Sequence, residues 1–293
     1  MKRVLLLSSE PPVKPKVMYL LSRNREEIGL QSHATTYTHL AIALDAENKS
    51  SEIFVDDRPF DMSGVYFRAW ANYAAMSSAL AVLLKNKKVP FTNSDVGTSG
   101  SDSKSYDYCK LFNHIRLPHT IIAYPEWLII NAAMLENRFQ YPYILKASDG
   151  RQGYDNYLIK CKAELTKSLK GYKKNALFIV QEFIPNSFDY RIIIVGGKAM
   201  QAYTRTRDPK SSSHVNNASQ GASKTVVNLT DIPKLCRLAE KAAKTLKREI
   251  CGVDIIVSSE SKKAYLVEVN SSPSLPYDTT VRLIQSYLTS TLK

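Results

Sequence analysis

Short apolar runs bounded by charged or turn-forming residues dominate the first third of the chain. Runs of this kind, which predict buried strands, are residues 2–8, 53–55 and 64–67. Residues 37–45 and 74–84 instead place apolar side chains at helical spacing and predict two helices. Strands that alternate with helices predict an α/β domain with a parallel sheet. A stretch rich in Ser, Gly and Asp, residues 92–105, ends this part of the chain.

The other two thirds carry more strands and one clearly amphipathic helix. The pattern predicts a helix over residues 105–115 and strands over residues 143–147, 177–183, 191–195, 252–258 and 264–270. Ahead of the last two strands, a helix is expected with Asp231 as its N-cap. Its apolar positions are Leu235, Ala239, Ala242, Leu246 and Ile250. Lys and Arg side chains cover the opposite side, which is more typical of a solvated face than of a binding surface.

Composition indicates the class of protein. With 293 residues, 44% of them hydrophobic, the chain is expected to be globular, with roughly two domains at about 150 residues each. No stretch approaches the roughly 20 mostly apolar residues of a membrane span. The apolar run after Lys2 and Arg3 is too short for a signal peptide, so we expect a cytoplasmic protein. The four cysteines show no CxxC spacing and are expected to be free thiols.

Positive charge is concentrated in the later part of the chain. Lys and Arg number 40 against 27 Asp and Glu, a formal charge of +13, of which residues 96–293 carry +11 and residues 1–95 only +2. Such a field suits nucleic acid, nucleotide phosphates, or an acidic protein or peptide. Charge alone does not choose among these partners.

Two carboxylates and one amide stand inside the last two apolar runs. Apolar neighbours on both sides predict that Asp254 and Glu268 lie in buried strands, so their charges need compensation. An antiparallel hairpin sets Asp254 opposite Glu268, and the two-residue period adds Asn270 to the same face. The same register pairs Ile256 with Leu266. Oxygen ligands without His or Cys favour magnesium or manganese. The alternative is that Lys or Arg from a neighbouring strand neutralises the acids.

A second group of candidate residues lies at the strand over residues 143–147 and in the loop that follows. Lys146 stands near the end of the strand, and Gly150 and Gly153 lie in the loop. Glycines let backbone N–H groups approach phosphate closely, and a Lys on a rigid strand adds a fixed positive charge. The order of residues differs from that of a P-loop, and a Gly-rich turn after a strand is more often only a turn.

A third group flanks two strands in the middle of the chain. Gln181 and Glu182 end an apolar strand, where exposed backbone groups can read an adenine edge, and Asp189 can bind ribose hydroxyls. Equally, Asp189 can simply pair with Arg191. Arg205 precedes a loop of low complexity, and Arg is suited to clamping phosphate or carboxylate. An exposed basic loop residue is the alternative there.

Taken in order, these segments resemble the ATP-grasp superfamily, and most closely its RimK-like branch of ATP-dependent carboxylate–amine ligases. The resemblance is clear over residues 101–270. It implies an α/β fold with an N-terminal parallel-sheet pre-ATP-grasp domain over residues 1–100. A two-lobed ATP-grasp domain of α+β type follows over residues 101–293. Its lid lobe would span about residues 118–184 and its metal-binding lobe about residues 185–293.

The resemblance also implies roles for single residues. Nucleotide-binding residues by this comparison are Lys104, Lys146, Ser148, Gly150, Gly153, Gln181, Glu182, Phe183, Ile184, Asp189 and Arg191. Asp254, Glu268 and Asn270 match the magnesium ligands, and Arg205, Lys146 and Asn217 match groups close to the chemical step. In the loop that holds Asn217, this chain has His-Val-Asn where the branch usually has Phe-Arg.

The activity that the resemblance implies is amide-bond formation through an acyl phosphate, with ATP and Mg²⁺ or Mn²⁺ as cofactors. We expect an enzyme that adds an amino acid to an acidic peptide or protein, and a homo-oligomer. A small-molecule ligase of glutathione-synthetase or dipeptide-ligase type is the alternative. A basic nucleic-acid-binding protein is less well supported, because no helix-turn-helix, zinc-finger or RNP signature occurs. Retention of all three metal ligands argues against a regulator that has lost catalysis.

Overall fold

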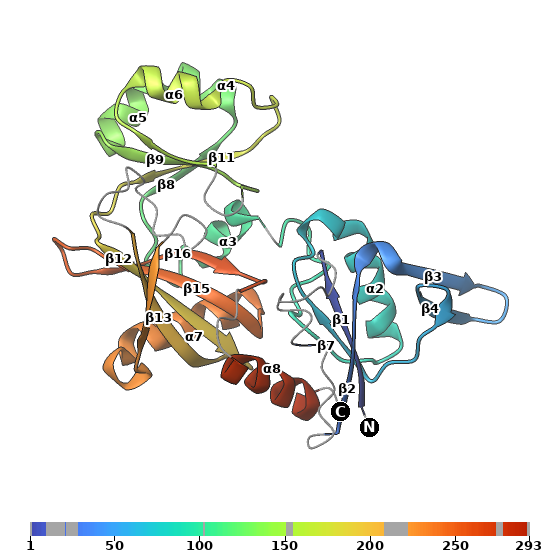
Figure 1. Cartoon of the computed structure of the whole chain (residues 1–293). Coiled ribbons are helices and arrows are strands. Elements are labelled where there is room, and N and C mark those ends of the chain that lie inside the picture. Colours follow the sequence, from blue (N-terminus) through green and yellow to red (C-terminus); the bar gives the residue numbers. More distant parts are fainter. Residues whose placement is uncertain are drawn as a thin grey trace.

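The computed structural model of the protein describes most of the chain and arranges it around four sheets (Figure 1). The described residues are 2–9, 21, 29–101, 103–150, 155–207, 222–273 and 278–291. One sheet is parallel and three are antiparallel, which confirms the expected mixed α/β class. The predicted division into domains at about residue 100 stays a prediction.

A parallel sheet in the order β2-β1-β6-β7 forms the first part. Its strands are β1 (Lys2–Ser8), β2 (Leu30–Thr36), β6 (Gly64–Phe67) and β7 (Phe91–Thr92). Helix α2 (Ala74–Asn86) follows the short turn η3 (Ala71–Tyr73) and covers one face. Leu5 and Leu7 belong to the core on this face, whereas Val4 and Leu6 belong to a core on the other face. Burial on both faces explains why β1 is an unbroken apolar run.

The helix predicted over residues 37–45 is wrong. Turn η2 (Tyr37–His39) leads into β3 (Leu40–Asp45), which pairs antiparallel with β4 (Ser50–Val55), and β4 pairs with β5 (Arg58–Pro59). The apolar positions that suggested a helix do not share one buried face, because Leu40 is buried but Leu44 is 75% exposed. This small sheet projects from the parallel sheet (Figure 1).

Residues 120–182, here called the small lobe, form an antiparallel sheet in the order β10-β9-β11-β8. Its strands are β8 (Thr120–Ala123), β9 (Tyr143–Ala147), β10 (Asn156–Ile159) and β11 (Phe178–Glu182). Its helices are α4 (Pro125–Ile130), α5 (Ala132–Phe139) and α6 (Lys162–Leu169), which cover one face (Figure 1). Leu145 and Val180 pack there against Leu128, Leu135 and Leu165.

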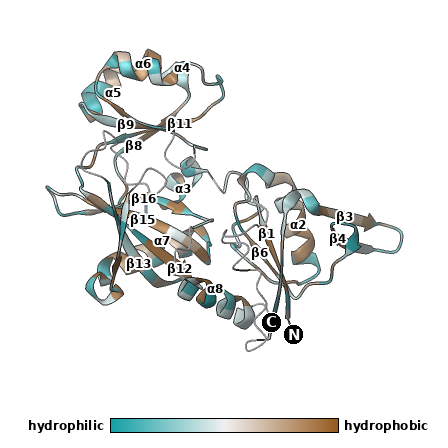
Figure 2. Ribbon diagram, viewed as in Figure 1, coloured by the Kyte–Doolittle hydropathy of each residue, from teal (hydrophilic) through white to brown (hydrophobic). Residues whose placement is uncertain are grey.

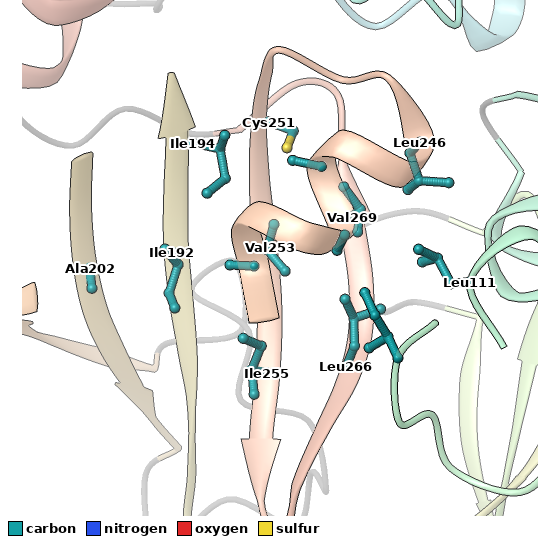
Figure 3. Close-up of a cluster of buried hydrophobic side chains, with 14 residues drawn as sticks. Leu111, Ile192, Ile194, Ala202, Leu246, Cys251, Val253, Ile255, Leu266 and Val269 are labelled. Carbon is teal, nitrogen blue, oxygen red and sulfur yellow. The ribbon is translucent and has the colours of Figure 1, made fainter. Parts of the chain in front are cut away.

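Residues 188–291, here called the body, contain a five-stranded antiparallel sheet in the order β14-β13-β12-β15-β16. Its strands are β12 (Phe188–Val195), β13 (Lys198–Thr206), β14 (Ser223–Val227), β15 (Ile250–Val257) and β16 (Ala264–Asn270). Its helices are α7 (Pro233–Leu246) and α8 (Asp278–Thr291), and α3 (Lys104–Leu111) precedes the small lobe and packs on α7 and β16. Ile192 and Ile194 gather with Leu246 of α7 and Leu111 of α3 (Figure 3).

The predicted start of the amphipathic helix is wrong by one residue. Asp231 lies in the turn η5 (Leu229–Asp231), and Ile232 stands directly before the helix, which begins at Pro233. Proline suits a first helical position because it has no N–H to satisfy there. The helix ends at Leu246, and Ile250 opens β15 instead of continuing the helix.

Helix α8 joins the body to the parallel sheet (Figure 1). Ile284 and Leu288 of α8 belong to one core with Val4 and Leu6 of β1 and Ile193 of β12. In Figure 2 the central strands of both sheets are hydrophobic, as burial on both faces requires. Among the described residues, no helix combines the length and apolarity that crossing a membrane requires. All four cysteines are free, as the sequence predicts.

Candidate active site

Five charged side chains lie on one face of the five-stranded sheet of the body. On that face they occupy the opposite end from the apolar side chains that contact α8. The strand register places Arg191 directly opposite Asp254, and Asp254 directly opposite Glu268. Asp189 lies opposite Arg205 in the same way. Because opposed residues in a sheet lie on the same side, this register alone brings the five side chains onto one face. All except Glu268 are at most 8% exposed.

The predicted pairing of Asp254 with Glu268 is confirmed, but the next predicted pair is wrong. Leu266 pairs with Ile255 and not with Ile256, because the register shifts between Asp254 and Ile255. One extra residue in β16, at position 267, accounts for the shift. A bulge of this kind bends a strand, and it lies directly beside Glu268.

Arginines hold both oxygens of Asp254. Arg191 donates from Nε to Oδ1 and from Nη2 to Oδ2, the latter at 2.7 Å, and Arg205 Nη2 lies 3.0 Å from Oδ2. Arg205 also donates to both oxygens of Asp189 at 2.7 Å, so the suggested pair of Asp189 with Arg191 is wrong. These bidentate contacts are the neutralisation by neighbouring arginines that the sequence left open as an alternative to a metal ion.

Two lysines set the charge of Glu268. Lys104 opens α3 and places Nζ 3.3 Å from Oε1 of Glu268. Burial alone would raise the pKa of Glu268, but Lys104 and Lys146 outweigh burial and hold this pKa at about 2. Burial lowers the pKa of Lys146 to about 7, although the negative charge of Glu268 opposes the change. The lysines and the carboxylate therefore form one coupled electrostatic group.

The loop after β9 is fastened to the start of α3. Ser148 accepts from the backbone N–H of Lys104 at 3.2 Å and, through its hydroxyl, from that of Ser105 at 3.2 Å. Lys104 Nζ donates to the carbonyl of Gly150. A Cβ at Gly150 would lie 3.0 Å from the Cβ of Asp155, so the backbone is closely packed there. Gly153 and Asn217, which the sequence also singled out, lie outside the described residues.

The residues predicted to contact adenine lie at the end of β11. Gln181 is buried and donates to the hydroxyl of Thr120 at 2.8 Å. Glu182 is tied to the backbone of His119, which donates its N–H to Oε1 at 2.9 Å. Phe183 and Ile184 follow outside the strand, and Ile184 is buried. The structure thus places all four at the junction between the small lobe and the body.

Sequence reasoning missed Tyr108, which connects three parts of the site. Its hydroxyl accepts from Lys146 Nζ at 2.7 Å and donates to the carbonyl of Val267. Burial raises the pKa of Tyr108, with a further contribution from Glu268, so the hydroxyl keeps its proton. The sequence does contain a signal for this residue, because Tyr108 stands one helical turn after Lys104 and therefore projects from the same side of α3.

The predicted metal ligands fit a hard divalent cation in chemical type. Glu268 and Asn270 supply a carboxylate and an amide oxygen from one strand, and Asp254 lies opposite Glu268. The Asn270 side chain makes no hydrogen bond within the described residues, whereas both oxygens of Asp254 are bound to arginine. No group of three or more His, Cys, Asp or Glu in the described part of the chain is arranged to hold a metal. The role of these residues as metal ligands stays a prediction.

Comparisons with known proteins agree on one family. The RimK-like ATP-grasp domain matches residues 79–284. A probable alpha-L-glutamate ligase of Halorhodospira halophila is 37% identical over 139 residues, which is 46% of this chain and 43% of that protein. One of Desulfotalea psychrophila is 29% identical over 219 residues, 73% of this chain and 46% of that protein. The matches thus span less than half the length of these relatives.

Solved structures match the chain over nearly its whole length. The macrocyclase MdnC bound with precursor peptide MdnA from Microcystis aeruginosa has a TM-score of 0.68 at 13% identity and covers 99% of this chain and 100% of that one. D-cycloserine synthetase DcsG has a TM-score of 0.66 at 14% identity, with the same coverage. At these identities the likeness shows a common fold.

Proposed function

The chain belongs to the family of RimK-like ATP-grasp domains, and from this premise we propose that it is an ATP-dependent carboxylate–amine ligase. The observation that carries the proposal is the charged group in which Lys104 and Lys146 act on Glu268. In the proposed reaction the terminal phosphoryl group of ATP passes to a substrate carboxylate and gives an acyl phosphate. An amine then attacks the acyl carbon, and an amide, ADP and phosphate result.

The basic side chains would serve the phosphates. Lys104 and Lys146 are fixed on α3 and β9, and a bound polyphosphate would favour the charged form of Lys146. Arg205 would turn from Asp254 toward the transferred phosphoryl group, because a guanidinium matches the geometry of phosphate oxygens. No side chain has to act as a nucleophile. Residues proposed to bind the rest of the nucleotide are Ser148, Gly150, Gly153, Gln181, Glu182, Phe183, Ile184, Asp189 and Arg191.

Asp254, Glu268 and Asn270 would hold magnesium or manganese, which supplies positive charge against the phosphates when bound. The pKa of Glu268, held low by the two lysines, keeps this carboxylate ionised at any physiological pH. Asp254 would lose one of its two arginine partners as Arg205 turns to phosphate, and Arg191 would have to release at least one of its oxygens to the metal ion. The five-stranded sheet keeps these oxygens in register throughout.

For the acceptor we propose an acidic peptide or protein. The +11 charge of residues 96–293 suits such an acceptor. Relatives of this chain are named alpha-L-glutamate ligases, and MdnC, of the same fold, was solved with a precursor peptide. A small-molecule ligase is the second candidate, because DcsG and the D-alanyl-alanine synthetase A of Vibrio cholerae share the fold equally well, at TM-scores of 0.66 and 0.68.

The test is ADP release that depends on an added acceptor. The protein is incubated with ATP, Mg²⁺ and pooled amino acids and peptides, and mass spectrometry of the products separates peptide acceptors from small molecules. We expect Glu268→Gln and Lys146→Ala to abolish the release, because each removes a charge from the coupled group.

Matched controls lie in the same parts of the chain, outside the charged group. Glu260→Gln changes an exposed carboxylate in the turn between β15 and β16, and Lys167→Ala an exposed lysine on α6 of the small lobe. Both controls should keep wild-type turnover, and circular dichroism should show all four variants folded. Near-normal turnover in Glu268→Gln or Lys146→Ala would count against the proposed function.

A further inference from the structure

Arg68 is a buried cation that the proposed reaction does not use. It directly follows β6, is 6% exposed, and donates from Nη2 to the carbonyl of Pro273 at 2.7 Å. Its Nη1 is buried and has no hydrogen-bond partner within the described residues, where Arg68 makes no ion pair either. Burying a charge without a counterion is costly, so a group that brings negative charge to Nη1 would stabilise this arrangement.

Tyr66 supplies a second polar group on the same side of the strand. Its hydroxyl is fully buried and interacts with the Arg68 guanidinium, but the hydroxyl proton has no acceptor within the described residues. Residues two apart in a strand share a face, and Arg68 is close enough to oppose the rise that burial causes in the pKa of Tyr66. The Tyr66 hydroxyl and the Arg68 guanidinium therefore lie side by side, and the hydroxyl proton remains available to a further acceptor.

The backbone around Arg68 is held firmly in place. The N–H of Arg68 donates to the carbonyl of Leu7 at 2.9 Å, and its own carbonyl accepts from the hydroxyl of Tyr37 at 3.1 Å. Ala69 follows at φ +51, in the left-handed region that residues with a Cβ rarely adopt. Unfavourable backbone conformations of this kind persist only where the surroundings enforce them, and they cluster at binding sites.

The position of Arg68 connects it with the candidate active site. The carboxyl ends of parallel strands are where α/β sheets bind ligands, and Arg68 stands at the end of β6. Pro273, its hydrogen-bond partner, follows β16 by three residues. A Cβ at Gly252 would lie 3.0 Å from both Pro273 and Arg191, so Arg191 and Pro273 meet at this glycine. Arg68 thus extends the group of arginines toward the parallel sheet.

We propose that Arg68 and Tyr66 bind a carboxylate of the substrate where the parallel sheet meets the body. The carboxylate accepts one hydrogen bond from Arg68 Nη1 and one from the Tyr66 hydroxyl, and it neutralises the guanidinium. This inference rests on the proposed function for the identity of the substrate, an acidic peptide. It assigns the selection of acidic over neutral substrates to a site in the parallel sheet, apart from the residues that serve ATP.

The test is equilibrium binding of two peptides that differ only in charge. Tri-glutamate and tri-glutamine are titrated calorimetrically into the full chain in the presence of ADP and Mg²⁺. We expect the wild type to prefer tri-glutamate. Arg68→Gln should weaken tri-glutamate binding by about 10- to 100-fold and remove the preference, because it removes the charged donor. Arg68→Lys should recover part of the affinity.

A second variant separates binding from folding. Tyr66→Phe removes a buried hydroxyl whose proton has no acceptor within the described residues, so its melting temperature should match or exceed that of the wild type. Its affinity for tri-glutamate should nevertheless fall, by about 3- to 10-fold. Arg58→Gln is the matched control, since this arginine lies in the same part of the chain with its side chain 87% exposed, and it should change nothing.

Three results would overturn the inference. They are an unchanged preference in Arg68→Gln, no binding of tri-glutamate to the wild type, and an equal loss of ADP affinity and tri-glutamate affinity in Arg68→Gln. Failure of the proposed function is distinguishable. A chain that binds tri-glutamate through Arg68 but never releases ADP with any acceptor would refute the ligase and leave the carboxylate site standing.

Discussion

Arg248 shows how one residue can hold distant segments together. It is 2% exposed, and its guanidinium donates to the carboxylates of Asp95 and Asp107 at 2.8 Å. It donates as well to the carbonyls of Ser101 and Val269. One cation then faces two carboxylates in a buried place, so the cluster carries an excess negative charge if both acids are ionised. An arginine between a helix and an apolar strand carries no signal of this role in the sequence.

The excess charge predicts a pH dependence of stability that Asp95 controls. Burial raises the pKa of Asp95 to about 7, Asp107 and Glu249 add to the rise, and Arg248 opposes it. The folded chain then holds a proton that the unfolded chain releases near pH 4. The contribution of Asp95 to the free energy of unfolding therefore falls as the pH rises from about 4 to about 7. Asp95→Asn removes the titration. The free energy of unfolding of Asp95→Asn, taken relative to wild type, should therefore increase as the pH rises from about 4 to about 7. Urea unfolding at several pH values measures this difference.

A stability difference between Asp95→Asn and wild type that stays constant from pH 4 to pH 8 would contradict this prediction. Asp57→Asn serves as the control, because its side chain is 86% exposed. It should show a constant difference over the same range.

At the scale of elements, the contacts along the outer edge of strand β16 fix the geometry of the candidate active site. This strand forms one edge of its sheet, and its outward backbone groups bind residues from elsewhere. The N–H of Leu266 donates to the carbonyl of Arg116 at 3.1 Å, and the carbonyl of Val267 accepts from Tyr108. Such contacts cover an edge that would otherwise be open to pairing with other chains. They also fix the distance between α3 and Glu268.

Loss of the Tyr108 hydroxyl should therefore weaken nucleotide binding. Tyr108→Phe removes the hydrogen bonds to Lys146 and Val267 but keeps the ring. We expect the KM for ATP to rise by about 3- to 10-fold, the effect of one or two neutral hydrogen bonds, with a smaller change in kcat. Tyr106→Phe on the same helix is the control and should leave both constants unchanged. Steady-state kinetics with varied ATP measures both, and an unaltered KM in Tyr108→Phe would refute the role of this hydroxyl.

Alternation along the strands was enough to predict much of this site. The apolar pattern located β15 and β16 and set Asp254 opposite Glu268. It did not show the bulge, because Val267 is as apolar as the other apolar residues of the strand, Leu266 and Val269. It did not predict β2 either, since the run LQSHATT is largely polar. The contacts of Asp254 with Arg191 and Arg205 depend on three strands meeting in one register, which residue spacing within one strand does not reveal.

For the whole molecule, one core joins segments from both ends of the described chain. Val4 and Leu6 of β1 pack with Ile193 of β12 and with Ile284 and Leu288 of α8. All five are 0% exposed. Because α8 serves both sheets, the parallel sheet and the body share part of their stability.

This shared core predicts a large effect from a single truncation. Ile284→Ala should lower the free energy of unfolding by about 2–5 kcal/mol, the usual cost of a cavity in a packed core. Ser286→Ala, exposed on the same helix, should change it by less than about 0.5 kcal/mol. Urea unfolding followed by circular dichroism measures both. A loss below about 1 kcal/mol in Ile284→Ala would mean that α8 contributes little to holding the sheets together.

The shared core also determines when β1 can complete its packing during translation. Strand β1 is made before the other described elements, but the core on one side of its sheet is complete only when residues 278–291 have left the exit tunnel. For most of translation, Val4 and Leu6 are therefore open to chaperones or to neighbouring nascent chains. A stop codon that removes α8 would deprive β1, some 280 positions upstream, of the side chains of Ile284 and Leu288 that complete this core.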